Sequence, residues 1–216
     1  MPSPPLRADA QRNRAQILHA AREVFTEQGT EAPLEEIARR AGVGIATLYR
    51  RFPERTDLIR AVAIEILTTL GEVAKSEGMS KEPYAALRSF AHAALDLKIG
   101  VIMPILIGYI ALEGELDVAS RNAIANVQQL LNNGIESGQV RPDIVVGDIA
   151  PMIVRLSRPL AGERFPNDAA LAHRQLDLYL DGMGIANTTK LPGPKLSAEE
   201  FIAIRDQILA ESSAAR

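Results

Sequence analysis

Side chains that can donate hydrogen bonds to phosphate or to base edges are concentrated in one short stretch of the chain. The donors are the hydroxyl of Thr47, the phenol of Tyr49 and the guanidinium groups of Arg50 and Arg51. The apolar Leu48 and Phe52 lie four residues apart, so they share one face of a helix and leave the donors mostly on the other. This arrangement is typical of a surface that reads a polyanion.

The elements around this stretch predict a helix-turn-helix. Apolar residues recur at helical spacing over Leu34–Ala41, which predicts a first helix. Gly42 ends that helix, because glycine takes the left-handed conformation without a steric penalty, and Val43 fills the corner. A second helix is predicted over Ile45–Phe52, and Pro53 ends it. Two helices joined by such a turn form the unit that lays its second helix in the DNA major groove.

The run GVGIATLYRRFPERTDLI resembles the signature of the TetR family of bacterial transcriptional repressors. The resemblance covers Arg14–Ala61 in order and spacing, including AREVFTEQG, and weakens beyond. It departs from the family pattern at Gly44, where a capping Ser is frequent, and at Arg55, where Lys is usual. The resemblance implies an all-α fold. An N-terminal three-helix helix-turn-helix domain is joined by a long helix to a C-terminal helical ligand-binding and dimerisation domain.

The resemblance also assigns roles in DNA binding. It implies that Thr47, Tyr49 and Arg55 bind phosphates, and we expect a phosphate contact from Arg51. Three residues lie at the exposed N-terminal part of the second helix, nearest the base edges: Ile45, Ala46 and Arg50. Arg50 binds either guanine or a phosphate in this interpretation. Before the motif, Arg12 and Arg14 are candidate phosphate contacts, whereas Arg39 and Arg40 are expected to be solvated or adjacent to phosphate.

The predicted domains follow from these patterns. Residues 1–53 form the DNA-binding domain, in which 1–8 is a Pro-rich disordered arm and the first helix runs from about Asp9 to Gln28. Residues 54–186 form the ligand-binding and dimerisation domain, which begins with one long helix to about Ser76. Residues 187–216 form a linker and an additional amphipathic helix over 197–209. That helix packs on the body, reaches a partner subunit or is a loosely held tail.

The middle of the body supplies the predicted ligand pocket. Gly100 and Pro104 are expected to break or kink an apolar run over 99–112 that is too short to span a bilayer comfortably. Its apolar side chains are either core or the wall of a pocket, and nearby polar groups orient a ligand. The candidate residues are His92, Leu95, Met103, Leu106, Ile107, Tyr109 and Ile110. A buried histidine with satisfied hydrogen bonds is the alternative role for His92.

Two helices near residues 145–157 and 168–182 are apolar on broad faces. The resemblance implies that this pair meets its copy across a two-fold axis to form a four-helix bundle, the alternative being an ordinary core pair in a monomer. The candidate interface residues are Ile149, Met152, Ile153, Leu156, Leu171, Leu176 and Tyr179.

Composition excludes several classes of protein. The absence of Cys excludes disulfides and thiol chemistry, and the three His residues are too scattered to indicate a metal site. Residues 1–60 hold ten Arg against eight Asp and Glu, a net charge of +2, whereas the whole chain carries −3. A mildly basic N-terminal part on an acidic body fits a DNA reader with a separate regulatory body. Neither a signal peptide nor a membrane span is expected, which indicates a cytoplasmic protein.

The sequence therefore predicts a homodimeric DNA-binding regulator rather than an enzyme. The resemblance implies a repressor that binds a double-stranded palindromic operator and is released by a small apolar effector. No cofactor is expected, because the chain shows no nucleophile with its base, no metal triad and no Gly-rich phosphate loop. The alternative is a helical ligand-binding or scaffold protein with a non-functional helix-turn-helix. The effector, the operator and the sign of regulation are not specified by the sequence.

Overall fold

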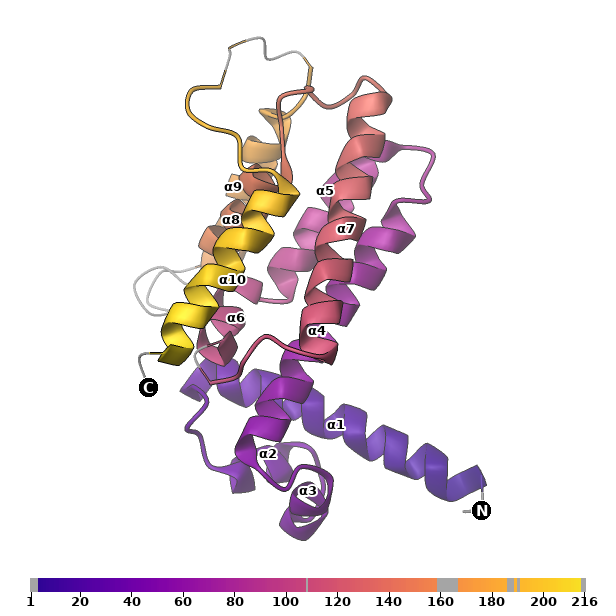
Figure 1. The fold of residues 1–216 in the computed structure, drawn as a ribbon. Coiled ribbons are helices and arrows are strands. Elements are labelled where there is room, and N and C mark those ends of the chain that lie inside the picture. Colours follow the sequence, from indigo (N-terminus) through magenta and orange to yellow (C-terminus); the bar gives the residue numbers. More distant parts are fainter. Residues whose placement is uncertain (1–3, 108, 159–166, 186–188, 190, 215–216) are drawn as a thin grey trace. The chain divides into compact units, whose positions relative to one another are not determined.

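The structure is a computed structural model that describes residues 4–107, 109–158, 167–185, 189 and 191–214 (Figure 1). Ten α-helices and no β-strand occur in this part of the chain, which confirms the predicted all-α class. None of the described helices is long and apolar enough to cross a membrane. The chain forms two compact units, one of Met1–Glu65 with Ile102–Ile110 and the other of Ile66–Val101 with Ala111–Arg216.

The first unit contains the helix-turn-helix. Its helices are α1 (Pro4–Gln28), α2 (Leu34–Arg40), α3 (Ile45–Arg51) and the first turns of α4 (Arg55–Glu77). The predicted start of α1 at Asp9 was too late, because the helix already begins at Pro4. A proline is tolerated in the first turn, where the missing N–H has no helical partner. The expected disordered arm is thus helical from Pro4, and residues 1–3 lie outside the described part.

The core of the first unit follows the predicted helical periodicity. The side chains of Ile17 and Phe25 on α1, Ile37 on α2 and Leu48 on α3 are all fully buried. Further buried apolar residues at the predicted positions are Leu18, Ala21, Val24, Leu34, Ala38, Ala41 and Phe52. Removing this apolar surface from water stabilises the unit by roughly 25 cal/mol per Å². The core therefore fixes which faces of α1 and α3 remain exposed.

The second unit is a bundle of longer helices. Its members are the rest of α4 with α5 (Pro83–Asp96), α7 (Glu115–Glu136), α8 (Val146–Leu156), α9 (Asp168–Asp181) and α10 (Ala198–Ala214). Leu87 and Phe90 of α5, Leu130 of α7 and Leu180 of α9 are fully buried in its core. The expected linker lies partly outside the described residues, since 186–188 and 190 are not among them.

Helix α6 (Ile99–Ile107) contains both Gly100 and Pro104, so of the two expected effects, a break or a kink, the break does not occur. Pro104 cannot donate to the carbonyl four residues earlier, which belongs to Gly100. The Nε of Arg158 donates to this carbonyl instead, at 3.3 Å. Gly100 is also required for packing, since a Cβ there would lie 1.8 Å from the carbonyl oxygen of Val154 on α8. The side-chain donor and the close crossing together explain why the helix is not interrupted.

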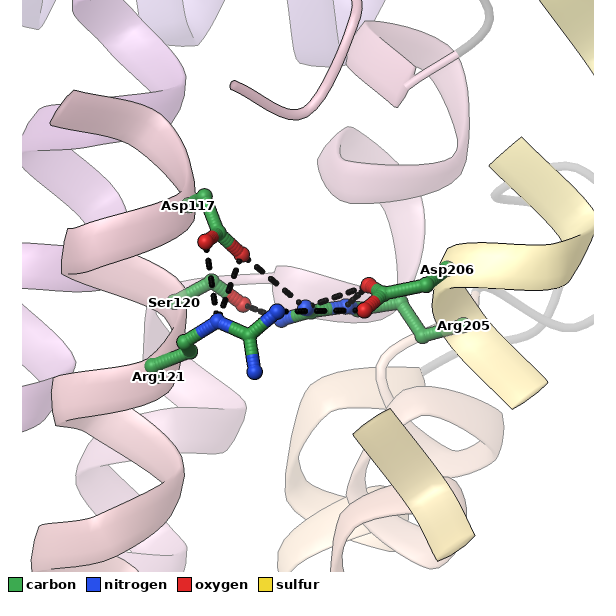
Figure 2. A network of polar contacts seen from close by, with 5 residues as sticks. All are labelled: Asp117, Ser120, Arg121, Arg205 and Asp206. Atoms are coloured by element: carbon green, nitrogen blue, oxygen red, sulfur yellow. Dashed lines mark hydrogen bonds and ion pairs between the residues drawn. The ribbon is translucent and has the colours of Figure 1, made fainter. Parts of the chain in front are cut away.

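Helix α10 packs on the body of its own chain, which decides among the three placements that the sequence left open. It contacts α7 and α8. Figure 2 shows that Arg205 of α10 reaches Ser120 and Asp117 of α7, while Arg121 of α7 reaches Asp206. The helix begins with the predicted capping box, in which the Ser197 amide donates to the Glu200 carboxylate at 2.8 Å.

Candidate nucleic-acid interface

The turn between α2 and α3 is fixed by local backbone hydrogen bonds. Gly42 has a φ of +66°, and its amide donates to the carbonyl oxygen of Arg39 at 3.2 Å. The Val43 amide donates to the carbonyl oxygen of Ala38 at 3.0 Å. These two bonds form the Schellman motif of a helix end, as the glycine in the sequence predicted. The direction in which α3 leaves the turn is therefore set by Gly42.

Helix α3 presents the predicted donor face to solvent. Ala46, Arg50 and Arg51 are exposed, and 46% of the surface of Tyr49 is accessible. Ile45 and Thr47 are half-buried at the edge of this face. Since Leu48 is fully buried, the helix cannot rotate about its axis without losing its core contact. The exposed face is therefore held in one orientation.

A shallow hollow of about 200 Å³ lies between the donor face of α3 and the N-terminal half of α1. Its lining residues are Ala10, Asn13, Arg14, Ile17, Thr47, Arg50 and Arg51. Five of these side chains carry hydrogen-bond donors, and three of the five are arginines, so the hollow is suited to phosphate oxygens. Sequence reasoning missed Asn13, because nothing in the local pattern distinguishes it from other polar residues of α1.

The two arginines predicted on α1 differ in their surroundings. Arg14 lines the hollow, and its guanidinium carbon lies 6.0 Å from the centroid of the Phe52 ring. Arg12 has an exposed side chain that pairs with Asp9 one helical turn earlier. Within α3, Arg50 donates to the Thr47 hydroxyl at 3.0 Å. None of the residues Arg12, Arg14, Thr47 and Arg50 is buried, so each side chain is at least partly accessible to solvent.

Arg55 has a role that the sequence did not predict. Its Nη1 donates to the carbonyl oxygens of Thr30 at 2.5 Å and of Ala32 at 2.7 Å. These carbonyls belong to the turn between α1 and α2, which the start of α4 thereby fixes. Phosphate binding by Arg55 stays a prediction, and any such contact has to use the donors that remain.

Arg39 and Arg40 both bind carboxylates, although the side chain of Arg39 is 71% exposed, as expected for a solvated residue. Arg40 binds both carboxylate oxygens of Glu27 on α1, at 2.9 and 2.6 Å, and also donates to Glu36 at 2.8 Å. Arg39 binds Glu36 through two hydrogen bonds of 2.8 Å. The hydrogen bonds from Arg39 and Arg40 lower the pKa of Glu36 to about 2. This network joins α1 to α2 beside the helix-turn-helix.

The residues predicted for a ligand pocket are distributed over both compact units. Leu95 belongs to the second unit, whereas Met103, Leu106 and Ile110 belong to the first. All four side chains are buried, which fits both a core role and a pocket wall. Tyr109 is 40% exposed, and the side chain of Ile107 lies outside the described residues.

Both ring nitrogens of His92 have polar partners. Nδ1 lies 2.6 Å from Nδ1 of His173, and Nε2 lies 2.8 Å from Asp177. The hydrogen bonds fit the alternative of a buried histidine with satisfied hydrogen bonds only in part, because the side chain is 28% exposed.

Three of the predicted dimer-interface residues require a correction. Ile149 and Ile153 of α8 and Leu176 of α9 are at most 5% exposed and belong to the core of the second unit. A side chain buried in its own chain adds no surface to a partner. Four candidates are half-buried: Met152, Leu156, Leu171 and Tyr179. Leu178 of α9 was not among the candidate interface residues, although it is 64% exposed.

Two family models match the chain. The model described as bacterial regulatory proteins of the tetR family matches residues 17–62, and the SbtR-like transcriptional regulator C-terminal domain matches residues 82–185. The HTH-type transcriptional repressor LfrR of Mycolicibacterium smegmatis is 39% identical over 99 residues. That alignment covers 45% of this chain and 52% of LfrR, so the chain spans about half the length of this relative.

Solved structures extend the similarity to most of the chain. The TetR transcriptional regulator SCO0520 from Streptomyces coelicolor is 31% identical with a TM-score of 0.65, covering 79% of this chain and 98% of that one. The structure of LfrR from Mycobacterium smegmatis in complex with proflavine is 25% identical with a TM-score of 0.63. This structural alignment covers 84% of this chain and 98% of the solved LfrR chain.

Proposed function

This chain belongs to the TetR family of bacterial regulatory proteins, and we propose that it is a homodimeric repressor released from a palindromic operator by a small apolar effector. The family consists of DNA-binding transcriptional regulators, which are not enzymes. The observation that carries the proposal is the exposed donor face of α3, which continues into the arginine-lined hollow beside α1.

In the proposed complex, α3 enters the major groove and the surrounding donors bind the backbone. Ala46 and Ile45 lie nearest the base edges, where a small side chain permits close approach and an aliphatic one contacts a thymine methyl. Arg50 reads a guanine through two parallel hydrogen bonds. Thr47, Tyr49, Arg51, Arg12 and Arg14 bind phosphates and so fix the register of α3 on the duplex.

The dimer places two copies of α3 about one turn of DNA apart, ~34–36 Å, which makes the operator palindromic. We assign the interface to the sides of α8 and α9 that the monomer leaves accessible, including Met152, Leu156 and Leu171, together with Leu178. Repression follows from the analogy with LfrR, which is a repressor. Such a protein acts in the bacterial cytoplasm, where the chromosome lies.

The effector acts through helices that contribute residues to both units. Helix α4 supplies its residues up to Glu65 to the first unit and the remainder to the second. Helix α6 supplies its residues up to Val101 to the second unit and those from Ile102 onward to the first. The start of α6 is fixed against α8 by the close approach of Gly100 to Val154. A rearrangement in the second unit is therefore passed on along two continuous helices. Effector and operator then weaken each other reciprocally, typically by about 1–3 kcal/mol.

Binding selection from a random DNA pool tests the proposal. The purified full chain is incubated with random duplexes at physiological salt, and bound DNA is amplified and sequenced. Enrichment of a palindrome whose half-sites are one DNA turn apart supports a dimeric repressor. A folded protein that enriches no sequence contradicts it and favours the scaffold alternative.

The selected operator then provides the test for effectors. Because the LfrR structure contains proflavine, this compound is the first probe. Release of the operator by proflavine, with no effect on a control protein bound to its own DNA, supports an effector site in the second unit. Unchanged affinity at saturating proflavine removes this compound as an effector and leaves operator binding intact.

A further inference from the structure

Two histidines from neighbouring helices meet end to end in the second unit. His92 of α5 and His173 of α9 have their Nδ1 atoms 2.6 Å apart. The ring centroids are 4.9 Å apart and the ring planes differ by 12°. For two imidazole rings whose Nδ1 atoms are this close, the centroid distance is near its maximum, which is reached when both Nδ1 atoms lie on the line between the centroids. The two rings therefore lie edge to edge in nearly the same plane rather than face to face. Each Nδ1 thus points at the other along the direction of its lone pair or its N–H bond.

The opposite nitrogens fix the protonation of each ring. Nε2 of His92 lies 2.8 Å from the Asp177 carboxylate, and Nε2 of His173 lies 2.9 Å from the Asp96 carboxylate. Ionised carboxylates only accept hydrogen bonds, so both Nε2 atoms carry protons. If both rings were neutral, two Nδ1 lone pairs would face each other. If both rings were charged, two Nδ1–H groups would face each other. The contact is attractive only when a single proton lies between the Nδ1 atoms.

The surrounding charges favour this shared proton. Three carboxylates, those of Asp96, Asp177 and Asp181, are accompanied by Arg88, which binds Asp177 at 2.5 Å and Asp181 at 2.6 Å. Without a charge on the histidine pair, this group of residues would carry −2. The hydrogen bond from His92, followed by the charge of Arg88, holds the pKa of Asp177 below its usual range.

Helices α7 and α8 also pack on α5, and the interactions of four of their charged residues are made elsewhere. Asp148 and Arg155 of α8 act on Tyr179. Asp117 and Arg121 of α7 belong to the contact with α10. The ionic contacts of the two histidine rings are made by residues of α5 and α9.

We propose that His92 and His173 form a proton-operated clamp, in which one proton shared by their Nδ1 atoms joins α5 to α9. Loss of that proton, or addition of a second, places like groups against each other and opens the contact. Histidine is the side chain whose ordinary charge change falls between pH 5 and 8. The clamp is strongest within this range and weaker on both sides of it. This inference concerns only the second unit and does not depend on DNA binding.

The chain suits nuclear magnetic resonance of its histidines, because it contains only three. The third, His19 on α1, has a 61% exposed side chain and serves as the internal control. Long-range proton–nitrogen spectra of the full chain are recorded from pH 5 to 8.5. We expect the signals of His92 and His173 to change together as those of a coupled pair, and independently of the signals of His19. In His92→Gln, the remaining His173 should titrate in a single step.

Thermal unfolding provides a second, independent readout. We expect the Tm of the wild type to exceed that of His92→Gln by about 2–4 °C in the middle of this pH range. The difference should fall by at least half at both ends, while His19→Gln follows the wild type throughout. The pKa of Asp177 is held below its usual range by the hydrogen bond from His92, so its titration does not contribute.

Two results would overturn the clamp. One is three independent histidine titrations, with the His173 curve unchanged in His92→Gln. The other is a Tm difference that stays constant from pH 5 to 8.5, which would assign the pair to packing alone. If His92→Gln fails to fold, the coupled titration in the wild type decides the question without it.

Discussion

The guanidinium of Arg55, at the first position of α4, donates through Nη1 to the carbonyl oxygen of Thr30 at 2.5 Å. The same nitrogen reaches Ala32 at 2.7 Å, so one side chain satisfies two carbonyls of the turn between α1 and α2. Thr30 is only 3% exposed. A buried carbonyl without a partner costs about 1–3 kcal/mol. Arg55 therefore stabilises the DNA-binding unit whether or not it also touches DNA.

Replacing Arg55 separates these two roles. We expect Arg55→Ala to lower the free energy of unfolding by about 1–3 kcal/mol, because both carbonyls lose their charged donor. Arg55→Lys keeps the charge but has a compact ammonium in place of the planar guanidinium. If the positive charge alone were responsible for both roles of Arg55, the Lys variant would keep full stability and full operator affinity. Urea unfolding and operator titration distinguish the outcomes, with the exposed Arg51→Ala as a control for stability.

Arg50 and Arg12 should differ in the kind of DNA contact that they make. We expect Arg50→Ala to relax the preference at one base pair per half-site, at about 1–3 kcal/mol per contact. Arg12→Ala should weaken binding to all sequences equally and reduce the salt slope by about 1. Titrations against operator variants at several salt concentrations measure both effects. Unchanged base preferences in Arg50→Ala would reassign Arg50 to phosphate.

Gly44 leaves the N-terminus of α3 without a side-chain cap. Its φ of −68° suits any residue, and a Cβ there would meet no atom within 4 Å. A serine hydroxyl at this position accepts from a free amide in the first turn, so Gly44→Ser should stabilise the unit by a few tenths of a kcal/mol. Gly44→Ala adds the Cβ without the acceptor and should not stabilise. A Tm of Gly44→Ser at or below that of Gly44→Ala would contradict the capping argument.

The sequence predicted the helix-turn-helix well because its determinants are local. Leu48 and Phe52 define the buried face of α3 within about one helical turn. Helix α2 ends through the bonds of the Gly42 and Val43 amides to residues three and five positions earlier, respectively. Such contacts depend on spacing along the chain rather than on the arrangement of distant helices. For the same reason Tyr49, Arg50 and Arg51 lie on the exposed face that the spacing predicted.

Contacts between distant residues were not predictable in this way. His92 and His173 are 81 positions apart, and Arg205 and Ser120 are 85 apart, so only helix packing brings them together. Apolar periodicity shows that a face is buried but does not show what buries it. Ile149 therefore resembled an interface residue, although its own chain covers it.

Tyr179 gives the chain a sensitivity to alkali. Burial, and then the charge of Asp148, raise the pKa of Tyr179 to about 12. The phenol donates to the backbone carbonyl of Asp148 at 2.8 Å. Because the pKa is raised in the folded state, the protonated phenol contributes stability that is complete below pH ~10 and is lost as the pH rises through the folded value.

The alkaline transition can be followed by tyrosine absorbance and circular dichroism. We expect a tyrosine step near pH 12 that is absent in Tyr179→Phe. We also expect the stability of the wild type to fall toward that of Tyr179→Phe between pH 10 and 12. The exposed Tyr49→Phe is the matched control and should unfold like the wild type. The same alkaline loss in Tyr179→Phe would show that another group is responsible.

Arg205 should hold α10 on the body of the chain. Its side chain is only 12% exposed and donates to Ser120 and, at 3.1 Å, to Asp117 (Figure 2). Arg205→Met keeps the apolar stem but removes these charged donors, so we expect a loss of about 1.5–3 kcal/mol. Detachment of α10 would also expose the preceding segment around the half-buried Leu196 to proteolysis. Ile204→Ala on the exposed side is the control. If Arg205→Met and Ile204→Ala resist urea and protease equally, apolar packing rather than the ionic network holds α10.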